Sequence, residues 1–509
     1  PQRGLTIDVH LEVGMSDHDH GKVHGHRFSS ATAPVAIALV CALARFAAPG
    51  TAAAGDPSLA RYSDDPSRTF WFLQISDLHI DTFLYGSEED QLEWALGAGF
   101  DAIQPFFVVA TGDLTDHTNG FNYLGAPNPE EWNLLNSILA GAGMGPDVYF
   151  DVPGNHDFYG DDGGFYLTYG VQALVQGTTQ PEWTLDLPFG LYHFVSAATA
   201  HNDDPPLPWP FDNVAVSDAE AAEIEANLLG HTDARLTIMF GHHDFEAAAG
   251  GGALRSLMLD HGVAHYGHGH VHDMNWAEGS GILRFRCGSM GQQADVNVCV
   301  WAVDNDTVSW GVTDAGSPWP AAVIPAPAAA RLGSSNDIVN PYAPSVPAAC
   351  SAAPIRVLAF DGAGVSEVLA NVDGGALSSL VENPATPNQW TGTFDATLLT
   401  PGVHALDVQV GGTEWRHFVS EFTVVDEPCV FDPLPETDDA EPAPDTSEPL
   451  PDEPPDATTD PAPDAETAED APADVPADMA ADSPADVPAD TEEEDDGGEV
   501  TGCGCSLAS

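Results

Sequence analysis

The sequence predicts an α/β fold for the middle of the chain, followed by a small all-β domain and a disordered acidic tail. In the middle, short runs rich in aromatic and β-branched residues alternate with helical stretches. A later block has strand runs without a helical period, and the last block is dominated by Pro, Ala, Asp and Glu. A length of 509 residues with 43% apolar content is enough for two folded domains beside such a tail.

The α/β block extends from about residue 70 to residue 312. Its strand runs lie at 70–76, 106–111, 147–152, 192–197, 235–240 and 262–266, and helical stretches at 130–142 and 218–230 separate some of them. Two further runs, at 282–287 and 296–312, read as hairpin strands. Strands separated by helices and then consecutive strands predict mixed sheets.

Three segments follow the α/β block. Residues 313–349 are rich in Pro and Ala and are predicted to be a linker. Residues 350–429 contain strand runs with turn signals at short intervals, which predicts a small β-sandwich of the Ig-like type. Residues 430–502 hold many acidic and no basic residues, and such a composition cannot bury enough apolar surface to offset chain entropy.

The two ends of the chain suggest export. From Met15 the sequence has Lys22 and Arg27, an apolar run at 33–44 and small residues at 51–55, which is a secretory signal pattern with cleavage after Ala54. Residues 1–54 are therefore predicted to be upstream residues and a signal peptide, and the protein to be secreted, periplasmic or on the cell surface of a bacterium. The histidines in this segment could instead bind metal, but they would be removed with it. Residues 503–509 resemble the start of a Cys-containing sorting signal, which would attach the protein to the cell surface; a small Cys-bearing tail is the alternative.

An oxidising compartment would allow disulfides. Cys287 and Cys299 flank a predicted hairpin, and Cys350 and Cys429 stand just before and just after the β domain. Both pairs are disulfide candidates, although the sequence alone does not fix the pairing.

The charge excludes some partners. The chain has 79 acidic residues against 13 basic ones, and Lys22 is its only lysine. Binding to nucleic acid or to an anionic membrane relies on Lys and Arg, so no nucleic-acid-binding surface is expected.

Metal-binding residue types follow the predicted strands, where an open α/β sheet forms its binding crevice. They are Asp77 and His79 after the first run, Asp113 after the second, Asn155 and His156 after the third, His242 after the fifth, and His268 and His270 after the sixth. Each short motif is weak evidence alone, but turns do not require five such motifs in order. His243 is the alternative to His242, whereas His117, His265 and His272 are interpreted as structural or supporting residues.

This pattern resembles that of the calcineurin-like metallophosphoesterase superfamily, which reads D-x-H, G-D, G-N-H-D/E, H and G-H-x-H. The resemblance implies a four-layer αββα sandwich, followed here by the Ig-like β domain, and a site for two divalent metal ions. One ion would be held by Asp77, His79, Asp113 and His270, and the other by Asp113, Asn155, His242 and His268, with Asp113 as the bridge.

The resemblance also implies an activity. Two ions about 4 Å apart can share a hydroxide that attacks a phosphorus atom, so the chain is expected to be an exported phosphohydrolase acting on a small phosphomonoester or phosphodiester. Mixed nitrogen and oxygen ligands suit Mn, Fe or Zn. His156 would protonate the leaving group, and Asp157 would orient its ring. The alternative is a catalytically weak or inactive surface protein that binds or adheres through its β domain.

Overall fold

The computed structural model describes residues 62–82, 87–116, 128–161, 163–201, 213–277, 281–292, 296–314, 319–333, 340 and 342–431. The predicted signal peptide, most of the acidic tail and the terminal cysteines lie outside the described residues, as does His117. No helix in the described part of the chain is both long and apolar enough to cross a membrane.

The first sheet has the strand order β13-β12-β1-β2-β3. Its parallel strands are β1 (Thr69–Ile75), β2 (Val108–Thr111) and β3 (Tyr149–Val152). The hairpin of β12 (Asn297–Asp304) and β13 (Thr307–Asp314) joins β1 in antiparallel orientation. All seven residues of β1 are buried, because both faces of this sheet are covered.

The second sheet has the order β10-β11-β9-β8-β5-β4 and is parallel from β5 through β11. Its strands are β4 (Glu182–Leu187), β5 (Gly190–Ala197), β8 (Leu236–Gly241), β9 (His265–His268), β10 (Asn275–Ala277) and β11 (Leu283–Arg286). The strand runs predicted from the sequence are confirmed within a few residues of their ends.

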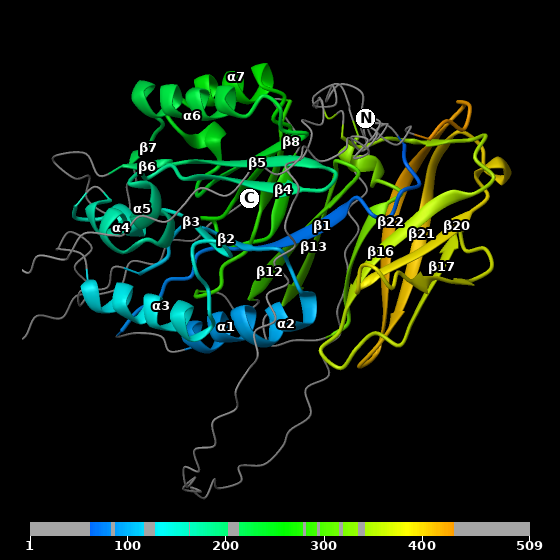
Figure 1. Cartoon of the computed structure of the whole chain (residues 1–509), viewed down its shortest axis with the longest axis horizontal. Helices are drawn as coiled ribbons and strands as arrows, with labels where there is room; N and C mark the ends of the chain where they lie inside the picture. Colours follow the sequence, from blue (N-terminus) through cyan, green and yellow to red (C-terminus); the bar gives the residue numbers. More distant parts are fainter. Residues whose placement is uncertain are drawn as a thin grey trace, which may run out of the picture. The chain divides into compact units, whose positions relative to one another are not determined.

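Helices cover the outer face of each sheet (Figure 1). The first sheet is covered by α1 (Glu88–Trp94), the π-helical turn Ala95–Gly99, α2 (Phe100–Ile103), α3 (Pro129–Gly141), α4 (Gly164–Tyr169) and α5 (Val171–Gln176). The second is covered by α6 (Asp218–Gly230), which begins at a Ser217–Glu220 capping box, and by α7 (Gly251–Asp260).

Aromatic side chains fill the space between the two sheets. Phe72 and Trp301 from the first sheet stack on each other with ring centroids 5.7 Å apart, and Phe194 and Phe240 from the second sheet pack against Phe72. The described residues therefore form helix, sheet, sheet and helix layers, in the order that the family resemblance implies. The loops at the carboxyl ends of the parallel strands in both sheets can therefore form a site.

The C-terminal domain is a β-sandwich. One sheet has the order β14-β16-β20-β19 and the other the order β15-β22-β21-β17-β18, and a core that includes Val357, Val408 and Phe422 lies between them. The strands are β14 (Ala321–Ala326), β15 (Val346–Pro347), β16 (Ala353–Phe360), β17 (Glu367–Val372), β18 (Ser378–Ser379), β19 (Val381–Glu382), β20 (Gln389–Phe394), β21 (Gly402–Gly411) and β22 (Trp415–Val425). That this sandwich is of the Ig-like type stays a prediction.

The prediction of a plain linker over 313–349 is wrong in part, because two strands of the sandwich lie in it. β14 pairs with β16 at the edge of one sheet, and β15 pairs with β22 in the other. Pro325 sits where the register of β14 shifts, and a proline is tolerated at such an irregularity on an edge strand. The Pro and Ala composition favoured a linker in the prediction, but an edge strand tolerates such a composition.

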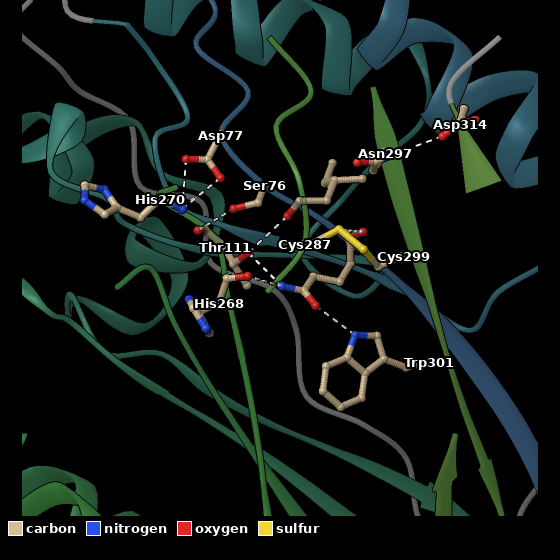
Figure 2. The surroundings of a disulfide bond; sticks show 12 residues. Ser76, Asp77, Thr111, His268, His270, Cys287, Asn297, Cys299, Trp301 and Asp314 are labelled. Atoms are coloured by element: carbon tan, nitrogen blue, oxygen red, sulfur yellow. Dashed lines mark hydrogen bonds between the residues drawn. A yellow bond between two sulfur atoms is a disulfide. The ribbon is translucent and has the colours of Figure 1, made fainter. Parts of the chain in front are cut away.

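Two disulfides join the candidate pairs. Cys350 and Cys429 are 79 residues apart in the sequence and close the β domain, a constraint worth about 3 to 5 kcal/mol in the chain-entropy account. Cys287, just after β11, is joined to Cys299 in β12 (Figure 2), so this bond ties the second sheet to the first.

Candidate metal centre

The candidate site lies in the loops that follow the central strands of both sheets. Asp77 and His79 come after β1, Asp113 after β2, Asn155 after β3 and His242 after β8. The first two loops are joined by hydrogen bonds from the backbone N–H of Asp77 to Gly112 O (3.0 Å) and from that of His79 to Asp113 O (2.9 Å). The loops thus hold their side chains in fixed positions relative to one another.

The backbone of these loops adopts an unusual conformation. Of ten non-glycine residues with positive φ among the described residues, five lie here. They are Asp77 (φ 51°), His79 (φ 47°), Asp113 (φ 48°), His270 (φ 76°) and His272 (φ 60°). Left-handed backbone in residues other than glycine is costly and is concentrated at functional sites.

One group of donor atoms comes from Asp77, His79, Asp113 and His272, whose ligand atoms all lie within 4.8 Å of one another. His272 Nε2 is 3.3 Å from Asp77 Oδ1 and 3.0 Å from His79 Nε2. His79 Nε2 is 3.7 Å from Asp113 Oδ2. Two imidazole nitrogens that face each other beside two carboxylates form a donor set suited to a divalent cation.

A second group shares Asp113. His242 Nε2 lies 3.1 Å from Asp113 Oδ2 and 3.1 Å from Asn155 Oδ1. His242 Nδ1 donates to Thr111 O (2.8 Å), so Nε2 is the ring nitrogen that faces the site. His243 and His270 also bring a ring nitrogen within 4.8 Å of His242.

His268 does not join either group, which corrects the sequence prediction. It is still part of β9, its Nδ1 is 3.2 Å from Gly269 O, and Figure 2 shows its ring turned away from Asp77. Burial lowers the pKa of His268 to about 4, with Arg286 acting in the same direction. His268 belongs to the interior of the second sheet.

The reason for this error is an ambiguity in the sequence. Residues 267–272 read GHGHVH and contain the G-H-x-H pattern twice, at 267–270 and at 269–272. The structure brings the second copy to the site: His272 takes the place expected of His270, and His270 takes the place expected of His268. The backbone N–H of His270 donates to both oxygens of Asp77 (3.0 Å each), which anchors this loop. A strand that ends at His268 would have identified the correct copy.

The residues fit a divalent metal ion. Burial raises the pKa of Asp113, but the charges of His242 and His156 lower it by more, so this pKa lies well below the usual carboxyl value. Burial lowers the pKa of His242, but Asp113 raises it to about 10. Among the described residues, the groups acting on Asp77 and Asp113 are histidines and another carboxylate rather than Lys or Arg. Buried anions without such partners require another source of positive charge.

His156 lies beside Asp113. Its backbone N–H donates to Asp113 Oδ1 (2.9 Å), its Nδ1 is 2.9 Å from Asp116 O, and its Nε2 is 4.0 Å from Asp113 Oδ2. Burial lowers the pKa of His156, but Asp113 and Asp116 raise it by more, so the net shift is upward. The His156 side chain is 14% exposed, so its ring is reached from solvent more readily than that of the buried His242.

Asp157 has a different role from the one predicted. Its carboxylate accepts hydrogen bonds from the backbone N–H groups of Gly154 (2.8 Å), Leu114 (3.1 Å) and Thr115 (3.1 Å). Burial and the charge of Asp113 raise the pKa of Asp157 to about 7. Asp157 therefore holds the Asp113 and Asn155 loops together, while the carbonyl of Asp116 orients the His156 ring.

Gly154 allows the close approach of these two loops. A Cβ at this position would lie 2.2 Å from both the backbone nitrogen and Oδ1 of Asp113. No side chain fits in that space, which accounts for the glycine before Asn155.

Several supporting residues were missed by sequence reasoning. Asp116 Oδ1 is 2.9 Å from His79 Nδ1 and accepts from Gln292 Nε2 (2.8 Å). Ser289 Oγ donates to Asp77 O (2.9 Å), and Gln74 Nε2 donates to the carbonyl of His268 (3.0 Å). Figure 2 shows the Cys287–Cys299 bond in the neighbourhood of Ser76, Thr111 and Trp301. These contacts join residues far apart in sequence, and no local motif marks them.

The revised ligand set makes a prediction. His272→Ala should lose metal from the group of Asp77 and His79 and lower the activity expected from the resemblance about 100-fold or more, whereas His268→Ala should keep its metal content. Metal analysis of the two purified variants, with melting temperatures to monitor folding, tests this. Metal loss from His268→Ala alone would restore the original assignment.

Comparison with known proteins is consistent with this site. Residues 70–274, which include every candidate ligand, match the sequence profile of the calcineurin-like phosphoesterase family. The chain is 25% identical over 391 residues to Transmembrane protein 62 of Mus musculus, covering 73% of this chain and 58% of that protein. It is 28% identical over 94 residues to an Arabidopsis thaliana protein named as a metallophosphoesterase, At3g03305, covering 18% of this chain and 12% of that protein. The chain thus spans less than two thirds of both relatives.

Solved structures give weaker matches. GAP50, the anchor in the inner membrane complex of Plasmodium, aligns with a TM-score of 0.35 at 15% identity, covering 49% of this chain and 85% of that one. A 5'-nucleotidase precursor from Thermus thermophilus aligns with a TM-score of 0.31 at 14% identity, covering 48% and 54%. Scores this low do not bear on function.

Proposed function

We propose that the protein uses two divalent ions to hydrolyse a small phosphomonoester or phosphodiester. The premise is that residues 70–274 form a calcineurin-like phosphoesterase domain and that the protein is a metal-dependent phosphoesterase. The observation that carries the two-ion proposal is the position of Asp113. Its Oδ2 lies 3.1 Å from His242 Nε2 on one side and 3.7 Å from His79 Nε2 on the other. A carboxylate oxygen that lies between two sets of donors is suited to bridge two ions.

The residues divide into two ligand sets. Asp77, His79, Asp113 and His272 would hold one ion, and Asp113, Asn155, His242 and His270 would hold the other. When bound, the ions would supply positive charge to the phosphoryl oxygens and lower the pKa of a water molecule at the site. Asn155 contributes a neutral oxygen, which keeps the site more positive toward phosphate than a third carboxylate would.

The ligands limit which ions would suit the site. Imidazole and carboxylate donors suit Mn, Fe or Zn. Asp116 stands where purple acid phosphatases carry a tyrosine ligand, and here its side chain contacts His79 Nδ1 (2.9 Å). We therefore propose a centre without tyrosinate coordination.

His156 is proposed as the residue that acts on the leaving group. Its Nδ1 is engaged by the Asp116 carbonyl, and its Nε2 lies on the Asp113 side of the ring. A protonated imidazole there can donate to a phosphoryl oxygen and then transfer its proton to the departing alkoxide. The upward pKa shift of His156 favours the protonated form before the reaction.

We also propose that the protein is exported. Two disulfides among the described residues fit an oxidising compartment, where such bonds persist. The alternative of an inactive surface protein would be supported by the loss of a ligand, but each of the five sequence motifs supplies at least one residue to the two ligand sets.

Removal and return of metal test the proposed function. Dialysis against a chelator should abolish hydrolysis of p-nitrophenyl phosphate, bis-p-nitrophenyl phosphate or nucleotides, and Mn²⁺, Fe²⁺ or Zn²⁺ should restore it as two ions return to the candidate centre. Activity that survives complete removal of metal would contradict the proposal. The ratio of monoester to diester turnover would identify the substrate class.

A further inference from the structure

A second cluster of metal-binding residue types lies away from the candidate centre, on the outer side of the second sheet. The ligand atoms of Glu182, His193 and His231 all lie within 4.8 Å of one another. Glu182 Oε2 is 2.8 Å from His193 Nε2 and 3.7 Å from His231 Nε2, and the two imidazole rings have centroids 4.4 Å apart. The His193 side chain is buried, while the other two are about 30% exposed.

The fold brings these residues together from three elements. Glu182 begins β4, and His193 in β5 pairs with Thr184, so Glu182 is its diagonal neighbour on the same face of the hairpin. This face also carries Val195, which packs under α6. His231 is the C-cap residue of α6. The end of the helix therefore places His231 over the Glu182–His193 pair.

The cluster is separate from the phosphoesterase site. His193 pairs with Thr237 in β8, five residues before His242. At the usual rise per residue of a strand, this separation is about 16 Å. No residue of the cluster belongs to either ligand set of the candidate centre.

We propose that Glu182, His193 and His231 form an additional binding site for a transition-metal ion of the Zn²⁺ type. Two imidazole nitrogens and one carboxylate are the donors that Zn²⁺ takes in open sites, with water in the fourth position, whereas Mg²⁺ and Ca²⁺ prefer oxygen donors alone. Ligand distances of about 2.1 Å in a tetrahedron separate the donor atoms by about 3.4 Å. The observed separations of 2.8 and 3.7 Å lie on either side of this value, so small side-chain movements suffice.

The surroundings favour a cation. The carboxyl end of α6 carries partial negative charge at the position of His231. Glu182 is also held by its backbone, because its N–H donates to Gln176 Oε1 (3.0 Å) and its carbonyl accepts from Gln176 Nε2 (2.9 Å). An ion here would tie the end of α6 to the β4–β5 hairpin.

The site should bind its ion weakly and exchange it. Coordination through Nε2 leaves the proton of His193 on Nδ1, and this buried nitrogen has no hydrogen-bond partner among the described residues. Metal-binding histidines whose other nitrogen lacks a partner bind about 10-fold to 100-fold less tightly. The ion is therefore distinguishable from those of the phosphoesterase site by its faster removal.

Metal stoichiometry tests this proposal. Equilibrium dialysis of the full chain against Zn²⁺, followed by metal analysis, should give one ion fewer per chain for His231→Gln than for wild type, with phosphoesterase activity unchanged. His261→Gln is the matched control, because His261 caps α7 in the same way and belongs to no such cluster among the described residues. Wild-type stoichiometry in His231→Gln would overturn the proposal.

Two further measurements separate this site from the phosphoesterase centre. Asp113→Asn should lose ions of the centre but keep the additional ion, and a variant that loses all ions together would overturn the proposal. With Cu²⁺ as the probe, electron paramagnetic resonance of wild type should show coupling to two imidazole nitrogens, reduced to one in His231→Gln. An unchanged spectrum would show that the copper binds elsewhere and would also overturn it.

Discussion

Asp113→Asn should remove nearly all phosphoesterase activity, by about 10⁴-fold or more, and should lower the metal content by one or both ions. Asp113 is the residue that the two ligand sets share, and an amide offers one neutral oxygen where the carboxylate offers two charged ones. Its Oδ1 also accepts from the backbone N–H of His156, which an amide oxygen can still do. The fold should therefore survive while the centre is lost.

Asp151→Asn provides a matched control for this variant. Asp151 and Asp113 are both 1% exposed, and Asp151, in β3, accepts backbone hydrogen bonds from Val171 (2.7 Å) and Gln172 (2.9 Å) at the start of α5. Its substitution should leave metal content and turnover close to wild type. Full metal content together with normal turnover in Asp113→Asn would refute a shared carboxylate.

Much of the candidate site could be predicted from the sequence because the carboxyl ends of parallel strands lie at the same edge of a sheet. Asp77, Asp113, Asn155 and His242 each follow a short buried strand, so locating the strand also located the candidate ligand. The same logic failed at GHGHVH, where two overlapping copies of one pattern differ by two residues. Only the end of β9 decides between them, and strand ends are the least certain part of a sequence prediction.

Supporting contacts could not be predicted in this way. Asp157 directly follows His156, yet its carboxylate turns back to the N–H groups of Leu114 and Gly154. Asp116 and Gln292 meet although 176 residues separate them. Such contacts depend on tertiary packing, and local sequence carries no periodic signal for them. The edge strand β14 was also missed, because it is a strand only through its pairing with β16, which lies in the next predicted domain.

The role of His156 should depend on the leaving group. His156→Ala is expected to keep its metal ions, because the ring is in neither ligand set, and to lose about 10² to 10⁴ in turnover on substrates with alkoxide leaving groups. An alkoxide needs a proton as it departs, and a protonated His156 imidazole can donate one. Turnover of p-nitrophenyl phosphate should fall much less, because p-nitrophenolate departs without protonation. Steady-state rates of both substrate types, measured with metal content on the same preparations, test this expectation.

The possible outcomes identify what the imidazole does. A larger loss with the alkoxide than with p-nitrophenolate is the signature of proton donation, which a purely structural residue would not produce. Equal losses on both substrates would mean that His156 only binds the phosphoryl group, and loss of metal would make it a ligand. Asp157→Asn distinguishes an effect on the His156 ring from an effect on its loop. The Asp157 carboxylate contacts backbone N–H groups rather than the His156 ring. This variant should therefore lower stability or metal retention and slow the hydrolysis of both substrates by similar factors. A leaving-group dependence in Asp157→Asn as steep as in His156→Ala would instead show that Asp157 acts through the ring.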